Sequence, residues 1–416
     1  MNKHRINFPS RTLIAGIGGF AAKHHVTFAD LEARNEARVV ATCDPMLEHL
    51  GEVCIAHGFD VRGVSTYKTF EEMCEAKRGG IELGVVATPI QCHAPMHQAF
   101  VHNRIACYLE KPPTLDPLEL QRMIEVDERA SIPTNVGFCF IHLSERLDLK
   151  RRMLDGEFGA LKQMSFLGLA AREPSYFQRN KWAGRLTLDG NLLLDSCLGN
   201  AMSHFVNSML FFANQNGLQA WARPLEMDCE LYRANAIEGT DTIFADCRLD
   251  SGVGLRMAAT HACDNKEQVV EERLEFERAT ITIKSVNIIT IERPGRADEV
   301  IQTVEASLPL SVGDYLKFLK GDTHRPAQTL PDCVGFVETN ALFYLAGKKI
   351  HTVPLKSLRQ ANRKSVVAIP DIEQAGRRFL ADGVLPSEAG YPWARPGGRS
   401  SVKDLPNLAR AVESLS

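Results

Sequence analysis

The feature that most constrains this chain is a glycine-containing turn near its beginning. The short apolar run Leu13-Ile14-Ala15 is typical of a buried strand, and Gly16-Ile17-Gly18-Gly19-Phe20-Ala21 follows it directly. A stretch of helical length, residues 21–35, comes next. Between a strand and a helix, the pattern Gly-x-Gly-x-x-Ala indicates a tight turn that points a helix N-terminus at a phosphate group.

Three small residues of this turn have distinct physical roles. Gly16 permits the tight turn, Gly18 lets the backbone approach a pyrophosphate, and Ala21 keeps the helix close to the strand. A second predicted strand ends at Asp44, 25 residues after Gly19, where a carboxylate can bind the hydroxyls of an adenosine ribose. The turn therefore predicts a dinucleotide site made by Gly16, Gly18, Gly19, Phe20 and Asp44.

The carboxylate of Asp44 also bears on which dinucleotide is bound. It would repel a 2′-phosphate, so the sequence favours NAD over NADP. The alternative interpretation makes Asp44 a turn residue before Pro45.

Two different patterns of strand-like and helix-like segments along the chain predict two domains. Strand-like runs at 12–15, 38–42, 83–87, 106–109 and 134–138 alternate with helix-like stretches, which favours a parallel sheet. Longer strand-like segments follow one another at 161–170, 220–232, 242–249, 254–261 and 271–291, which favours an antiparallel sheet. Helices are expected at 199–213, 312–319 and 333–346. We expect a dinucleotide-binding domain at 1–135 and a second domain with C-terminal helices at 136–416; the family resemblance described below implies that the first is a Rossmann domain and the second a substrate-binding and oligomerisation domain.

Composition excludes several other classes. The net charge of −3 arises from 51 acids and 48 bases without a long basic block, so the footprint of a nucleic-acid binder is missing. Glycines interrupt the apolar stretch 13–22, which fits neither a signal peptide nor a membrane span. The 11 cysteines are scattered without a Cys-x-x-Cys pair, so we expect no metal site and no disulfide framework. These observations predict a cytoplasmic protein without nucleic-acid or membrane partners.

Two further segments carry a family resemblance. Val85-Val86-Ala87-Thr88-Pro89 precedes His93 by four residues, and Tyr108-Leu109-Glu110-Lys111-Pro112-Pro113 lies between a predicted strand and a capped helix. Together with the glycine turn, Val136-Gly137-Phe138, Trp182, Arg185 and Asp195, they make the chain resemble the Gfo/Idh/MocA oxidoreductases. The resemblance implies an N-terminal Rossmann domain and a C-terminal α/β domain with a large open, mainly antiparallel sheet. That sheet carries the substrate and often an oligomer interface, so a homodimer or homotetramer is expected.

The resemblance also assigns roles near the cofactor, to Thr88, Pro89, His93, Glu110 and Lys111. It makes Lys111 the acid/base beside the nicotinamide. An amine suits this role because burial and a neighbouring cation can bring the pKa of a lysine toward the working pH. The alternative is an exposed lysine that pairs with Glu110. His97, on the same predicted helix as His93, is expected to be structural.

One position departs from the family pattern. The family usually places a histidine four residues after the aspartate that faces the substrate; here Asp195 is followed at that spacing by Gly199. The next helix carries Asn200, Ser203, His204 and Asn207 on one face, which predicts a side toward a polar cavity or water. We expect Asn200 and His204 to lie in the substrate cavity, His204 as a proton acceptor or orienting donor. The alternative is a solvent face or a hydrogen-bonded core histidine.

A segment upstream of Asp195 combines aromatic rings with hydrogen-bond donors. Sugars need this mixture, because rings stack on their C–H faces and planar donors bind vicinal hydroxyls. The candidate substrate-binding residues are Tyr176, Arg179, Asn180, Trp182, Arg185 and Asn200. The alternative is a surface loop whose aromatic side chains pack on one another.

The sequence thus predicts an NAD-dependent dehydrogenase that moves a hydride between nicotinamide and a secondary alcohol or ketone of a sugar, sugar derivative or cyclic polyol. Its candidate catalytic residues are Lys111, Asp195 and His204. One alternative is a tightly bound NAD used transiently for elimination, epimerisation or bond cleavage. Another is a non-catalytic protein that senses NAD or a sugar, motivated by Gly199.

Overall fold

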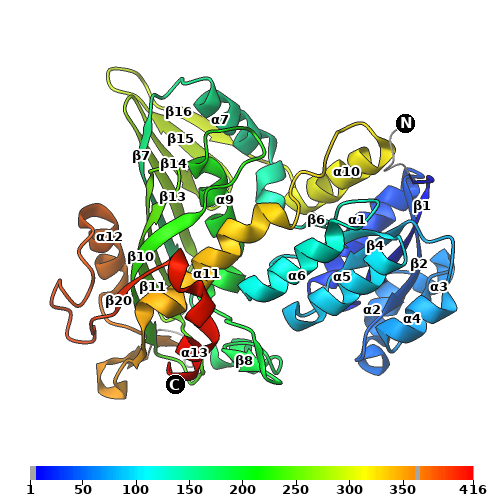
Figure 1. Ribbon diagram of the computed structural model, residues 1–416, viewed down its shortest axis with the longest axis horizontal. Coiled ribbons are helices and arrows are strands. Elements are labelled where there is room, and N and C mark those ends of the chain that lie inside the picture. The colour runs from blue at the N-terminus through cyan, green and yellow to red at the C-terminus, as the bar shows by residue number, and fades with distance from the viewer. Residues whose placement is uncertain (1–5, 361–365, 416) are drawn as a thin grey trace. The chain divides into compact units, whose positions relative to one another are not determined.

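A computed structural model describes residues 6–360 and 366–415 (Figure 1). The chain divides into two compact units. The first unit consists of residues 1–114, 118–142 and 306–331, and the second of 115–117, 143–305 and 332–416. Beside the predicted domains 1–135 and 136–416, this division differs chiefly in assigning residues 306–331 to the first unit.

The first unit is built on a six-stranded parallel sheet in the order β3-β2-β1-β4-β5-β6. The strands are β1 (Ser10–Ala15), β2 (Ala37–Cys43), β3 (Ser65–Tyr67), β4 (Leu83–Val86), β5 (Ala106–Leu109) and β6 (Asn135–Val136). Its helices are α1 (Ala21–Ala33), α2 (Gly51–Ala56), α3 (Phe59–Arg62), α4 (Phe70–Ala76), α5 (His93–His102), α6 (Pro117–Asp127) and α10 (Ser307–Lys320). The strand order reverses between β1 and β4, which is where doubly wound sheets bind ligands at their carboxyl edge.

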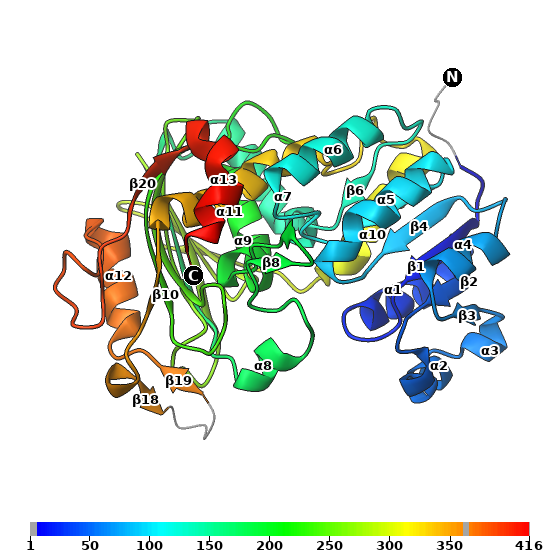
Figure 2. The same ribbon diagram turned by 60° about the horizontal axis from the view of Figure 1, so that its bottom comes forward.

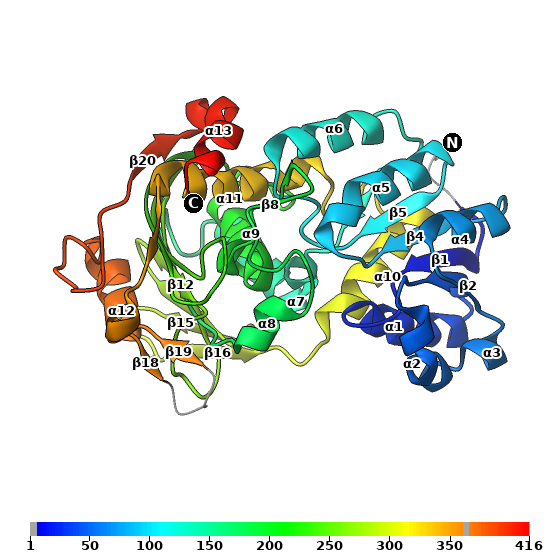
Figure 3. The same ribbon diagram turned by 90° about the horizontal axis from the view of Figure 1, so that it is seen from below.

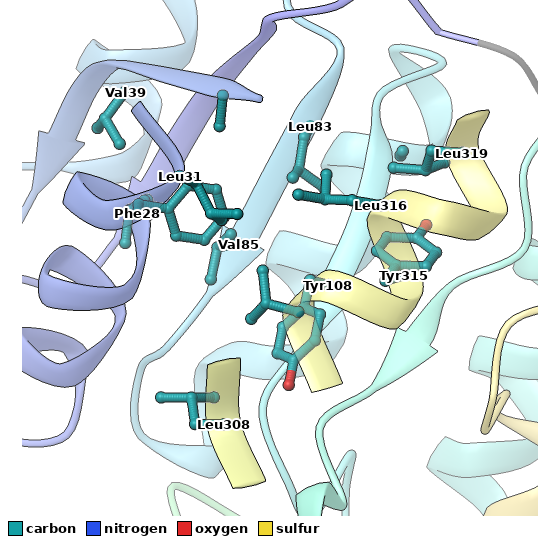
Figure 4. Close-up of a cluster of buried hydrophobic side chains, with 14 of the residues drawn as sticks. Phe28, Leu31, Val39, Leu83, Val85, Tyr108, Leu308, Tyr315, Leu316 and Leu319 are labelled. Carbon is teal, nitrogen blue, oxygen red and sulfur yellow. The ribbon is translucent and has the colours of Figure 1, made fainter. Parts of the chain in front are cut away.

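Helix α10 belongs to the first unit because its apolar face completes that unit's core. Leu308, Val312, Tyr315, Leu316 and Leu319 pack in one cluster with residues of α1 and of the central strands. Figure 4 shows this cluster, with Phe28 and Leu31 of α1 facing Leu83 and Val85 of β4. The hydroxyl groups of Tyr108 and Ser311 also lie 2.8 Å apart. A segment distant in sequence therefore covers one face of the Rossmann sheet.

The second unit contains a ten-stranded sheet in the order β16-β15-β14-β13-β7-β12-β11-β10-β17, with β20 paired to β10. Its strands are β7 (Leu161–Leu169), β10 (Pro224–Arg233), β11 (Thr242–Leu249), β12 (Gly254–Thr260), β13 (Val269–Phe276), β14 (Thr280–Lys284), β15 (Ile288–Glu292), β16 (Glu299–Gln302), β17 (Ile350–Thr352) and β20 (Gly398–Ser401). Neighbouring strands are antiparallel except for the pairs β12–β7 and β10–β17. The predicted fold class, a Rossmann domain plus a large, mainly antiparallel sheet, is confirmed.

Helices cover both faces of this larger sheet. They are α7 (Ser144–Leu154), α8 (Pro174–Gln178), α9 (Ser203–Ala213), α11 (Val334–Gly347), α12 (Ile372–Asp382) and α13 (Leu408–Glu413). Figure 3 shows α9 and α11 on one side and α12 on the other. Phe205 of α9 stacks on Phe166 of β7, whereas α12 packs on the outward side chains of the same strand, Leu167 and Leu169. Two short hairpins, β8 (Thr187–Leu188) with β9 (Asn191–Leu192) and β18 (Arg359–Gln360) with β19 (Val367–Ala368), lie outside the sheet (Figure 2).

Two predicted elements are wrong in detail. The strand expected at 271–291 is three strands, because turns at 277–279 and 285–287 interrupt it; Ser285 and Val286 adopt positive φ without the Asn-Gly signal typical of such turns. The helix expected at 199–213 begins as a π-helical turn, Cys197–Ala201, and becomes α-helical only at Ser203. Both differences concern local backbone geometry that apolar periodicity does not report.

Candidate active site

The glycine turn of the first unit has the geometry that its sequence predicts. Gly16 has φ +108°, and a Cβ there would lie 2.5 Å from the Ala87 carbonyl oxygen and 2.8 Å from the Ala21 Cβ. Gly19 has φ +56° in open space, whereas Gly18 lies beside the flexible end of Leu50. The close approach of β1, β4 and α1 at Gly16 therefore admits glycine alone.

Asp44, at the end of β2, is bound to this turn. Its Oδ2 accepts hydrogen bonds from the backbone N–H of Ile17 (3.1 Å) and Gly18 (3.3 Å), and its Oδ1 accepts one from Met46 N–H (2.9 Å). The Asp44 carboxylate therefore stabilises the turn that follows it, as the alternative interpretation predicts, and it also contacts the glycine loop. The loop amides already hold an anionic group, which fits the binding of a dinucleotide at this edge.

Two further loops leave the carboxyl ends of β4 and β5, and His93 joins them. The imidazole Nε2 lies 2.9 Å from the Thr88 carbonyl oxygen, and Nδ1 lies 2.9 Å from that of Pro112. The side chain is buried, with 1% of its surface exposed. Burial lowers the pKa of His93, against the effect of the two carbonyl groups. His93 therefore supports the two loops, and its predicted role beside the cofactor stays a prediction.

A second buried histidine, His24 of α1, contacts Glu110 in the turn that carries Lys111. Its Nε2 lies 2.8 Å from Oε1 of Glu110, and Oε2 of Glu110 accepts a hydrogen bond from the Lys111 N–H at 3.1 Å. His24 and Glu110 are both buried, whereas Lys111 is half-buried. The backbone of Lys111 is thus fixed to the dinucleotide helix. No sequence motif identifies His24, because a lone histidine inside a helix carries no local signal.

His97 behaves as the sequence analysis expects. Its Nε2 lies 3.2 Å from Asp127 Oδ1 and 3.1 Å from Thr134 Oγ1, and the side chain is fully buried. These partners lie on α6 and before β6, so His97 stabilises helix packing.

In the second unit, Asp195 is buried and its carboxylate is oriented by backbone. Oδ2 accepts the Gly184 N–H at 2.6 Å, and the Asp195 carbonyl accepts the Tyr344 hydroxyl at 2.8 Å. With 6% of its surface exposed, Asp195 is held from two sides. The preceding Leu194 has φ +51°, so the segment turns sharply at the aspartate.

The absence of a histidine at position 199 has a structural reason. A Cβ on Gly199 would lie 2.4 Å from Oδ1 of Asn340, which comes from α11. Asn340 also accepts the Ser196 hydroxyl at 3.0 Å and donates to the Leu194 carbonyl oxygen at 3.1 Å. The asparagine therefore occupies the space beside the Asp195 segment that a side chain at 199 would need.

The polar stripe on α9 does not form a solvent face. Ser203 and Asn207 are completely buried, and the Ser203 hydroxyl donates to the Asn200 carbonyl oxygen at 2.8 Å. Asn200 and His204 are half-buried at the start of the helix. The predicted alternative of a water-facing helix is wrong, because α9 packs on β7 of the sheet and also contacts α11.

An aromatic and guanidinium cluster forms around α8, and we call Arg172, Tyr176, Arg179, Trp182 and His261 the ring cluster. The Arg179 guanidinium lies 3.7 Å from the Tyr176 ring centroid and 5.2 Å from that of Trp182. Arg172 lies 4.9 Å from the Tyr176 centroid, and His261 makes an edge contact with Tyr176 at 5.6 Å. Burial lowers the pKa of His261 to about 3. Its imidazole is therefore neutral at physiological pH.

Two members of the ring cluster, Arg172 and His261, were missed by the sequence analysis. They follow β7 and β12, whose parallel pairing sets Leu169 beside Thr260, and the Arg172 N–H donates to the His261 carbonyl oxygen at 3.1 Å. Of the predicted substrate residues, Tyr176, Arg179 and Trp182 come together. Asn180 accepts the N–H groups of Trp182 (3.1 Å) and Ala183 (2.8 Å) through its Oδ1, so it stabilises this turn, and its predicted contact with substrate stays a prediction.

Arg185 lies outside the ring cluster. It is exposed over 58% of its side chain and lies 3.7 Å from the Glu238 carboxylate.

Within the described ranges, no helix is long and apolar enough to cross a membrane. Nor do three or more His, Cys, Asp or Glu side chains of those ranges gather as a metal site would require.

Comparison with known proteins identifies the first unit. Residues 10–138 match the model of the Gfo/Idh/MocA oxidoreductase family, described as having an NAD-binding Rossmann fold. A search of curated proteins finds no match.

Solved structures show that the fold extends through most of the chain. The WlbA dehydrogenase from Bordetella pertussis, in complex with NADH and UDP-GlcNAcA, is 18% identical with a TM-score of 0.65 over 81% of this chain and 95% of its own. Levoglucosan dehydrogenase in complex with NADH is 12% identical, with a TM-score of 0.67 over 81% and 96%. UDP-N-acetylglucosamine 3-dehydrogenase from Acidithiobacillus ferrooxidans is 16% identical, with a TM-score of 0.62 over 81% and 97%. At these identities the likeness establishes the fold.

The strand order, the glycine turn and the family match agree with one another. The predicted family and the predicted NAD cofactor are confirmed by the match over residues 10–138. The chain is therefore an NAD-binding oxidoreductase whose residues 10–138 are the Rossmann domain of the Gfo/Idh/MocA family.

Proposed function

We propose that this protein is a dehydrogenase acting on a secondary alcohol of a sugar, a sugar derivative or a cyclic polyol, with Lys111 as its acid/base. The observation that carries the proposal is the double attachment of the Lys111 turn, through His24–Glu110 to α1 and through His93 to the Thr88 loop. A lysine held at the carboxyl edge of a Rossmann sheet has a fixed backbone from which its amine can reach a reacting hydroxyl.

The residues of the first unit fit NAD. The glycine loop leaves no room for a side chain at Gly16, and its amides of Ile17 and Gly18 face the Asp44 carboxylate. Gly16, Gly18, Gly19 and Phe20 would hold the pyrophosphate, and Asp44 the adenosine ribose, while Thr88 and Pro89 would flank the nicotinamide. When bound, NAD supplies the acceptor and donor of a hydride.

Lys111 handles the proton that accompanies this exchange. During oxidation of an alcohol its amine accepts the hydroxyl proton, and during reduction of a ketone its ammonium donates one to the oxygen. Geometry decides whether such a group works, because the amine must lie within hydrogen-bond reach of the oxygen. The contacts of Glu110 and Pro112 support this role, because they hold the backbone from which the Lys111 side chain extends.

The second unit supplies recognition of the substrate in this proposal. The ring cluster offers aromatic faces from Tyr176 and Trp182 and guanidinium donors from Arg172 and Arg179, a combination that suits a polyhydroxylated ring. Arg185 and Asn200 remain candidates for further hydrogen bonds to it. The related dehydrogenase structures bound to UDP-GlcNAcA support a sugar as the substrate class.

Asp195 and His204 complete the proposed catalytic set. The Asp195 carboxylate is buried and already oriented by Gly184, so it is suited to orient a substrate. His204 begins α9 and is half-buried, which leaves part of the ring accessible as a proton acceptor or donor.

The deciding experiment screens sugars and polyols with NAD and NADP, and then compares the wild type with Lys111→Met. We expect NAD-dependent reduction with at least one substrate, and a fall in kcat of about 10²–10⁴-fold in the variant, the size typical of a lost acid/base. The dissociation constant for NADH should change less than about threefold, since Lys111 does not hold the pyrophosphate. Lys68→Met, at an exposed lysine paired with Glu48, is the matched control.

Two outcomes contradict the proposal. If Lys111→Met keeps wild-type kcat on a substrate found in the screen, Lys111 is not the acid/base. If NADH binds but no sugar or polyol reduces NAD, the protein is a sensor of NAD or a sugar and not a dehydrogenase. NAD that survives gel filtration and turns over without net NADH would instead indicate transient oxidation.

A further inference from the structure

A cavity of about 290 Å³ in the second unit has no role in the proposed reaction. It lies at the end of β10 and along β17, and three cationic side chains line it: Arg233, Lys349 and Arg395. Its apolar lining includes Ile350, Trp393 and Leu415. No carboxylate side chain is among its lining residues, all of which lie in the described ranges.

The arginines of this cavity are bound to neutral partners. Arg233 donates from Nε to the Thr352 hydroxyl (2.9 Å) and from Nη1 to the Glu238 carbonyl oxygen (2.7 Å). Arg395 donates from Nη1 to the backbone carbonyl oxygens of Pro392 (3.1 Å) and Ala394 (2.6 Å). These bonds fix the directions of both guanidinium groups without cancelling their charge.

His351, also in the lining, responds to the positive potential. Its Nε2 lies 3.1 Å from the Pro396 carbonyl oxygen, and its pKa is lowered by burial and further by the charges of Lys349 and Arg395. Like charges that converge on one concave surface repel one another, and an anion placed among them relieves that repulsion. The chain as a whole carries a net charge of −3, so this positive cavity is a local feature.

We propose that the cavity binds a small organic anion with an apolar body, either a phosphate monoester or a carboxylate. The anionic group would contact Arg233, Lys349 and Arg395, and the apolar body would lie on Ile350, Trp393 and Leu415. The volume is near the lower end of the range for ligand pockets, which suits a molecule of one ring. This inference does not depend on the proposed dehydrogenase activity.

The test is isothermal titration calorimetry of the full chain with phenyl phosphate, inorganic phosphate and benzoate. We expect saturable binding of phenyl phosphate, tighter than that of inorganic phosphate because of the apolar floor, and weakened by added salt. Benzoate binding more tightly than phenyl phosphate assigns the carboxylate class, and the reverse order assigns the phosphate class.

Variants locate the binding. Lys349 and Arg395 are exposed, so both can be changed together. The double change Lys349→Gln with Arg395→Gln should weaken binding of the preferred probe by about tenfold or more. The matched control, Lys162→Gln with Arg273→Gln, removes exposed cations from β7 and β13 and should leave the affinity unchanged. Thermal unfolding verifies that both double variants are folded. No saturable binding by any probe, or equal affinity in both double variants, overturns the proposal.

Discussion

The loops at the carboxyl edge of the Rossmann sheet and the ring cluster of the second unit present different kinds of surface. The glycine loop excludes side chains and offers backbone amides, so its form depends on where a Cβ cannot fit. The ring cluster offers side chains, stacked on one another from segments that follow β7 and β12. A shared cofactor is suited to the first kind of site, because backbone geometry changes little from protein to protein. A variable substrate is suited to the second, since single side chains can be exchanged.

The strongest test of this contrast is Gly16→Ala. The added Cβ would meet the Ala87 carbonyl oxygen at 2.5 Å, and φ +108° is strained for any L-residue. We expect a loss of unfolding free energy of about 1–3 kcal/mol, and NADH binding weakened by about 10²-fold because the loop must shift. Fluorescence titration with NADH and thermal unfolding measure the two effects.

Gly19→Ala is the matched control for this change. Its φ of +56° carries a cost of about 1 kcal/mol, but the Cβ meets open space. NADH affinity should therefore fall much less than in Gly16→Ala. Equal affinities in the two variants would show that close approach at Gly16 is not what shapes the cofactor loop.

His93→Gln tests whether the loops at β4 and β5 act as one body. Removing the imidazole breaks the contacts to the Thr88 and Pro112 carbonyl oxygens, which should cost about 1–3 kcal/mol of stability. We expect kcat to fall by about 10-fold to 10²-fold, because the Lys111 turn is displaced from the Thr88 loop. Steady-state kinetics with a substrate from the screen gives kcat and KM separately.

His97→Gln distinguishes an effect on the position of the Lys111 turn from an effect on stability alone. This histidine is buried on the same helix, but its partners Asp127 and Thr134 lie away from the loops. A similar loss of stability with unchanged kcat is expected. If both variants lower kcat alike, the effect of His93 arises from general destabilisation.

The contrast between the two regions also explains what a sequence can predict. The glycine loop lies within six consecutive residues, so its geometry follows from local pattern. Arg172 and His261 meet only because β7 and β12 pair in parallel, and no local signal reports that pairing. Likewise, Asn340 of α11 occupies the space beside Gly199, which a pattern read along the chain shows only as a missing histidine. The fold class was accessible from the sequence, whereas contacts across the large sheet were not.

Acidification should distinguish the two regions through their buried histidines. His25, whose Nε2 lies 3.0 Å from the Gly16 carbonyl oxygen, has its pKa lowered to about 4 by burial; that of His261 in the ring cluster is lowered to about 3. Between these values and the ordinary pKa of 6.5, the unfolded chain binds more protons than the folded chain. Stability is therefore fully present above about pH 6.5 and falls as the pH drops toward 4 and then 3.

Denaturant unfolding at two pH values measures this loss. Each histidine should contribute at most about 2 kcal/mol of destabilisation between pH 7 and pH 5. His25→Gln and His261→Gln should each reduce the pH dependence by that share. If neither variant changes the difference between pH 7 and pH 5, carboxylates control the acid response instead.

The smallest expected effect belongs to single side chains of the ring cluster, and Arg179→Lys isolates one of them. Lysine keeps the charge but loses the flat guanidinium that lies 3.7 Å from the Tyr176 ring centroid. Loss of such stacking is worth about 0.5–2 kcal/mol, so we expect KM for the sugar to rise by about 3-fold to 10-fold with kcat and NADH affinity unchanged. Arg248→Lys, at an exposed arginine of β11 paired with Glu226, provides the control. If KM is unchanged in both variants, the ring cluster does not bind the substrate. If Arg179→Lys weakens NADH affinity, the ring cluster also affects cofactor binding, and the proposed contrast between the two regions is wrong.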